Sequence, residues 1–176
     1  MSKNSNNKSN LKTGRPIIKL KFNNTEKIMI TISIAVTLLM WAYVLLNVKQ
    51  MPMTIPTHFT MSGKPNSWGS RNTIFIMPII CSVVIGLLIS ISRFPRFFNY
   101  PIKITEKNAE KQYRNSGQLM LALAIELPLV FLYIEYKIVQ SALGLSLGLG
   151  NYFFTIFIVI IFGTIIFFTR RMRKLG

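Results

Sequence analysis

Four long runs of apolar residues constrain the fold of this chain more than any other feature. They cover residues 28–48, 74–91, 119–139 and 152–168, and nearly all charged side chains lie between or outside them. A helix of about 20 mostly apolar residues is long enough to cross the hydrocarbon core of a bilayer. We therefore expect an all-α membrane protein with four transmembrane helices.

The charge of the chain agrees with this interpretation. Only 15% of the residues are charged, yet the formal net charge is +16. A soluble domain would carry charge on roughly a quarter of its residues, and a strongly basic one would suggest nucleic acid. Here the basic residues flank the apolar runs, which is typical of membrane proteins. We expect membrane lipids as partners, anionic headgroups included, and no nucleic acid.

The distribution of Lys and Arg predicts the orientation. The N-terminal tail holds seven of them, the first loop three, the second loop six, the third loop none and the C-terminal tail four. The positive-inside rule then places both termini and the second loop in the cytoplasm. Residues 1–26 and 170–176 become cytoplasmic tails, residues 27–169 the transmembrane domain, and residues 49–73 an ordered loop facing outward.

The two longest cytoplasmic segments are expected to differ in order. The tail over residues 1–26 is polar, basic and poor in aromatic residues, which predicts disorder. The loop over residues 92–117 mixes aromatic side chains with arginines and predicts an amphipathic helix, capped at Thr105 and carrying a Glu110–Arg114 ion pair. Its role is either that of a membrane-lying connector or that of a docking site for a cytoplasmic partner.

The outward loop contains the most informative residues. Its prolines and glycines predict turns and extended segments rather than a helix. Trp68 is placed for the headgroup level of the bilayer. His58 either contacts a ligand or senses pH, or else hydrogen-bonds the backbone of its own loop. Lys64 and Arg71 contact an anionic headgroup or an acidic peptide, or are ordinary solvated charges.

Enzyme and metal chemistry find no support in the sequence. The chain has one histidine, one cysteine and no aspartate, which cannot supply a usual metal-ligand set. No glycine-rich phosphate motif and no nucleophile–base pattern is present. We expect neither a metal, nor a cofactor, nor an enzyme.

The third apolar run contains ionisable residues, which are functional candidates at membrane depth. Counting along the run places Glu126 near mid-membrane, whereas Glu135 and Lys137 lie near the outer boundary and can reach the interface. Helical periodicity places Glu126, Tyr133 and Lys137 on one face and Glu135 on the opposite face. Glu126 is either structural or functional, and its expected partners are Thr31, Ser33, Thr37 or Ser82.

The outward loop also resembles a known family. The shared residues are the run from Ile55 to Phe59, then Gly63, Pro65, Trp68, Gly69 and Arg71, followed in the inner loop by Asn99-Tyr100-Pro101 and residues 104–114. This pattern resembles a bacterial membrane domain of unknown function that forms the N-terminal part of SdpI-type immunity proteins. Asn66 stands where that family usually has an acidic residue, and SdpI-type proteins are longer.

The resemblance implies a protein of the bacterial cell membrane that gives immunity to, or senses, a secreted antimicrobial peptide. Its ligand contacts would be His58, Phe59, Lys64, Trp68 and Arg71, and a cytoplasmic regulator or a membrane partner is left open. The alternative is a small oligomeric transporter or a membrane scaffold in which Glu126 is the intramembrane functional group.

Overall fold

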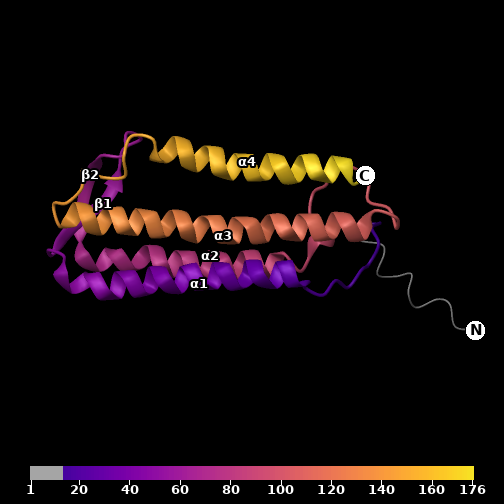
Figure 1. Ribbon diagram of the computed structural model, residues 1–176, viewed down its shortest axis with the longest axis horizontal. Coiled ribbons are helices and arrows are strands. Elements are labelled where there is room, and N and C mark those ends of the chain that lie inside the picture. The colour runs from indigo at the N-terminus through magenta and orange to yellow at the C-terminus, as the bar shows by residue number, and fades with distance from the viewer. Residues whose placement is uncertain (1–13) are drawn as a thin grey trace, which may run out of the picture.

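The computed structural model describes residues 14–176, which are mostly helical (Figure 1). The long helices are α1 (Asn24–Asn47), α2 (Ile76–Ile91), α3 (Ala109–Ala142) and α4 (Phe153–Lys174). All four are long and apolar enough to cross a membrane, α2 together with the 3-10 turn that precedes it. The prediction of four membrane-length helices is confirmed, and they indicate a multi-pass membrane protein.

Helix α3 is the centre of the bundle. It lies beside α1, α2 and α4 (Figure 1), and α4 packs chiefly against it. Met40 of α1 and Cys81 of α2 are buried against each other, with Phe131 of α3 packed on them. The apolar stretch of α4, by contrast, is left unburied.

The two ends of the bundle differ in structure. At one end, named here the hairpin end, strands β1 (Thr54–Phe59) and β2 (Pro65–Ser70) form an antiparallel pair beside the connection from α3 to α4 (Figure 1). The other end, named here the basic end, holds residues 14–23, the α2–α3 connection and the C-terminus. The loop predicted as extended is thus a β-hairpin, and the fold is mostly helical rather than all-α. The cytoplasmic placement of the basic end stays a prediction.

Helix α1 begins earlier than hydropathy predicts because its first turn is capped. The side chain of Asn23 accepts a hydrogen bond from the Glu26 amide (2.8 Å), and the Glu26 carboxylate accepts one from the Asn23 amide (2.9 Å). This reciprocal capping box satisfies two amides that lack partners inside the helix. Polar residues therefore form the first turn, which an apolar window leaves out.

The N-terminal segment differs from the predicted disorder where the structure describes it. Residues 1–13 lie outside the described part. The Arg15 guanidinium donates hydrogen bonds to the carbonyls of Arg96 (2.9 Å) and Phe98 (2.6 Å), and the Tyr113 hydroxyl donates one to the Pro16 carbonyl (2.9 Å). Ile18 and Leu20 pack on a small apolar cluster of the basic end. These hydrogen bonds and apolar contacts order a segment that composition alone assigns to disorder.

The second loop holds no separate amphipathic helix. A 3-10 turn (Pro95–Phe97) is followed by irregular chain, and the predicted helical residues form the first turns of α3. The N-cap is Asn108 rather than Thr105. The Asn108 side chain accepts a hydrogen bond from the Thr105 amide (2.8 Å) in the preceding turn and makes no capping bond to α3. The Glu110–Arg114 ion pair is confirmed, with a separation of 3.7 Å.

Candidate functional site

The hairpin is fixed to the bundle by an apolar cluster. Ile55 of β1 is buried with Val44 of α1, Ile74 before α2, and Ile138 and Val139 of α3. Alternate residues of a strand face opposite sides, but a bulge between Pro56 and His58 shifts the register here. One part of β1 therefore reaches the core while His58 stays exposed.

The tip of the hairpin is held by the α3–α4 connection. The Leu149 amide donates a hydrogen bond to the Gly63 carbonyl (2.8 Å), and the Tyr133 hydroxyl donates one to the Leu149 carbonyl (2.8 Å). Gly63 has a φ of +75°, and a Cβ at this residue would lie within 2.8 Å of the Gly150 nitrogen. Glycine is needed both for this backbone conformation and for the close approach.

The exposed side of the hairpin carries His58 and Trp68. His58 Nδ1 lies 2.6 Å from Asn66 Oδ1, so the imidazole pairs with a side chain rather than with the loop backbone. Since an amide oxygen accepts only, His58 Nδ1 is the donor in this pair. Trp68 and Lys64 are exposed and are free to meet a partner.

The other two predicted ligand residues, Arg71 and Phe59, make contacts inside the fold. The Arg71 guanidinium donates a hydrogen bond to the Met51 carbonyl (2.9 Å), which joins the end of β2 to the chain before β1. Phe59 is half-buried and packs on the apolar cluster below the hairpin. The structure thus brings His58, Lys64 and Trp68 to the surface and uses Arg71 and Phe59 to support them.

A cavity of about 410 Å³ lies beneath the hairpin, and its lining includes Glu135. The expectation that Glu135 reaches the interface is wrong, because its side chain is fully buried. Neither of its carboxylate oxygens has a hydrogen-bond partner within residues 14–176. Hydropathy placed Glu135 near the membrane boundary, but it could not show that the hairpin covers this end of α3.

The predicted partners of Glu126 are also wrong. Its carboxylate accepts a hydrogen bond from the Thr164 hydroxyl of α4 (2.5 Å), and not from a residue of α1 or α2. Tyr133, on the same face of α3, stacks on Phe153 of α4 with ring centroids 5.4 Å apart. Lys137 is half-buried. The face of α3 that carries Glu126 and Tyr133 is therefore the surface on which α4 packs.

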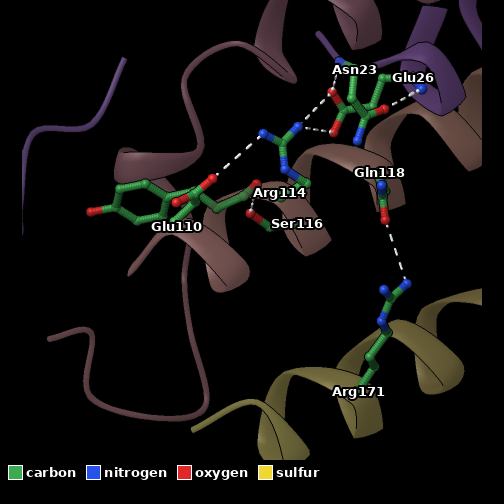
Figure 2. Close-up of polar contacts among 8 residues, drawn as sticks. Asn23, Glu26, Glu110, Arg114, Ser116, Gln118 and Arg171 are labelled. Atoms are coloured by element: carbon green, nitrogen blue, oxygen red, sulfur yellow. Dashed lines mark hydrogen bonds and ion pairs between the residues drawn. The ribbon is translucent and has the colours of Figure 1, made fainter. Parts of the chain in front are cut away.

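An ion pair at the basic end ties α1 to α3. Figure 2 shows the Arg114 guanidinium between Glu26 of α1 and Glu110 of α3. Its separation from the Glu26 carboxylate is 3.1 Å, and Glu26 is buried whereas Glu110 is exposed. The sequence suggests only the Glu110 pair, because the Glu26 pair joins distant parts of the chain.

Three features of the site were missed by sequence reasoning. In the sequence, Asn66 stands out only because the related family has an acidic residue there, although an amide can pair with His58 across a two-stranded hairpin. Gly148 gives no signal in the sequence, and only the structure shows that a Cβ at this residue would collide with the Gly63 carbonyl. Thr164 lies in an uncharged apolar run and gives no signal. Within residues 14–176, no cluster of side chains could hold a metal ion.

Comparisons with known proteins give a family without a described activity. Residues 35–81 match a family described as "Domain of unknown function (DUF1648)", and this range contains the whole hairpin. An uncharacterized protein of Archaeoglobus fulgidus is 30% identical over 150 residues, which cover 77% of this chain and 82% of the archaeal one. No solved structure matches the chain.

Proposed function

This chain belongs to the same family as the uncharacterized Archaeoglobus fulgidus protein, and we propose that it is a membrane immunity or peptide-sensing protein. Its hairpin end would meet a secreted antimicrobial peptide at the outer surface of a bacterial cell membrane. The family gives no activity, so the proposal rests on the hairpin and on the resemblance of residues 55–71 to SdpI-type immunity proteins.

The observation that carries the proposal is a braced hairpin with exposed apolar and basic side chains. Trp68 is 58% exposed and Met61 70% exposed, although β1, which pairs with β2, is anchored in the core through Ile55. A preordered surface loses little conformational entropy when it binds. Trp supplies a large rigid contact area of the kind that dominates peptide interfaces.

The chemistry of the hairpin suits an amphipathic peptide. Trp68 and Met61 would cover its apolar side chains, while Lys64 would pair with a carboxylate or with the peptide's C-terminus. His58, held by Asn66, keeps its Nε2 as an acceptor for a peptide N–H group. A peptide already bound to the bilayer surface would reach this hairpin without leaving the interface.

A transporter or scaffold centred on Glu126 is the alternative. The Glu126–Thr164 hydrogen bond gives that carboxylate a role in joining α3 to α4. We therefore place the function at the hairpin and expect Glu126 substitutions to lower protein level rather than to abolish protection in the protein that remains.

The test is survival of a sensitive bacterium that expresses the chain and is challenged with a panel of secreted antimicrobial peptides. Trp68→Ala and His58→Ala should lose protection at an unchanged level in the membrane. Phe97→Ala is the matched control, because Phe97 is also a well-exposed aromatic residue but lies at the basic end (62% exposed). Absence of protection by the wild type against every peptide, or equal protection by all variants, would refute the proposal.

A further inference from the structure

The cavity beneath the hairpin has the size of a small-molecule site. Its volume of about 410 Å³ falls in the range of about 300–1,000 Å³ that ligand pockets occupy. It lies between the hairpin, the start of α2 and the end of α3, all of which meet at the hairpin end (Figure 1). Its lining is mostly apolar, with Ile55, Ile74 and Ile138 as buried walls.

Glu135 is the one ionisable side chain among the described residues that line this cavity. It is fully buried, and both of its carboxylate oxygens lack a hydrogen-bond partner within residues 14–176. A buried carboxyl group without partners is costly, whether it is ionised or neutral. Glu135 is therefore an unpaired acceptor in the wall of the cavity, and because its oxygens are covered, a ligand reaches them only when the side chain turns into the cavity.

A cation is the partner that such a site favours most, and it has to come from a ligand. No Lys, Arg or His among the described residues lines the cavity. Lys137 follows Glu135 by two residues, which turns it roughly 200° around α3 and away from the cavity. A hydrogen bond from an ammonium group to a carboxylate is stronger than one between neutral groups.

The side of the cavity formed by α2 is exposed on the surface of the bundle. Ile76 and Ile80 of α2 line it and are 53% and 49% exposed, whereas Ile55 and Ile74 deeper in the site are buried. Exposed isoleucines on a membrane-length helix face the lipid chains. A ligand that enters between them would already be dissolved in the membrane, with its apolar part against these isoleucines.

We propose that the cavity beneath the hairpin binds an amphipathic amine, in which an apolar chain or ring carries one ammonium group. The ammonium group donates hydrogen bonds to the Glu135 carboxylate, and the apolar part fills the space between the hairpin and α2. The site goes beyond the proposed function, since it needs no peptide on the outer face of the hairpin. The amine is either a free alkylamine or the amine of a lysine in an apolar peptide.

The test uses the full chain in phosphatidylcholine nanodiscs and measures the saturable binding of labelled dodecylamine, with empty nanodiscs subtracted. Glu135→Gln keeps the size of the side chain and should weaken binding by about tenfold or more, the effect of one hydrogen bond to a charged group. Glu126→Gln is the matched control, because it removes a carboxylate from the same helix outside the cavity. Ile76→Trp narrows the entrance, leaves Glu135 in place and should also weaken binding.

Competition identifies the source of the amine. Displacement by an apolar peptide with one lysine, but not by the same peptide with norleucine, assigns the site to peptides. Retained dodecylamine binding without displacement assigns it to free amines, and either result supports the proposal. Equal binding to Glu135→Gln and wild type, equal displacement by dodecanol and dodecylamine, or no saturable binding would overturn it. None of these outcomes depends on protection of cells, so they are independent of the test of immunity.

Discussion

Replacing Gly63 by alanine tests whether the α3–α4 connection holds the hairpin in place. The alanine would have to adopt a φ of +75°, and its Cβ would meet backbone atoms of Gly150. The left-handed conformation costs about 1–2 kcal/mol for a residue with a side chain. The contact with Gly150 would also break the hydrogen bond from the Leu149 amide to the Gly63 carbonyl. Leaving such buried groups unsatisfied costs about 1–3 kcal/mol more.

Gly144→Ala is the matched control for this substitution. Gly144 has the same φ of +75°, but nothing lies within 4 Å of a Cβ placed there. Gly144→Ala should lower the free energy of unfolding by the conformational cost alone, about 1–2 kcal/mol. Gly63→Ala should lower it by at least about 1 kcal/mol more.

The assay is unfolding of the purified protein in detergent, combined with hydrogen exchange at the Leu149 amide. In Gly63→Ala the Leu149 amide should exchange faster, because its acceptor has moved away. If Gly63→Ala and Gly144→Ala have the same stability and the Leu149 amide stays protected, the hairpin is not held by this contact and the reasoning is wrong.

Three further predictions concern the basic end. Glu26→Gln keeps the shape of the helix cap but removes the buried charge, and should lower the free energy of unfolding by about 1–3 kcal/mol, whereas Glu110→Gln should not change it measurably because that partner is exposed. Burial raises the pKa of Tyr100 from 10.0 to about 12. The stability contributed by its neutral form is therefore complete below pH 10 and is lost as the pH rises toward 12. The unfolding midpoint should fall over this interval, and it should fall less in Tyr100→Phe. The Gln112 side chain donates a hydrogen bond to the Met172 carbonyl (2.7 Å), and Gln112→Leu should speed hydrogen exchange in the last turn of α4 severalfold, which corresponds to about 1 kcal/mol.

Hydropathy was sufficient to predict the four helices, because a membrane-crossing helix needs only length and apolar composition. The extended first loop is predicted by Pro52, Pro56 and Pro65, which disfavour a helix. Hydropathy does not predict the cap at Asn23 or the order of residues 14–23. The order of residues 14–23 depends on contacts with residues of α3 and the second loop. The cap at Asn23 depends on Glu26, three residues later, and a hydropathy window does not score such a hydrogen bond.

Only part of the candidate site can be predicted from the sequence. The exposed residues of the hairpin can be recognised there, whereas the burial of Glu135 cannot. His58, Lys64 and Trp68 stand out in a short polar loop, and the structure leaves them exposed. Counting depth along a single helix places Glu135 at the membrane boundary. Its burial depends on a hairpin that lies far from it in the sequence. Helical periodicity within α3 cannot predict that contact.

The contact between Gly63 and the chain around Leu149 has a consequence for biosynthesis. During translation the hairpin emerges well before the α3–α4 connection. The contact at Gly63 therefore cannot form until α3 and this connection have been synthesised. We expect a chain arrested before residue 148 to carry a hairpin that proteases cleave readily, and release of the complete chain to end that sensitivity. The hairpin end would then be the last part of the fold to become ordered, and incomplete chains in the membrane would lack the braced hairpin.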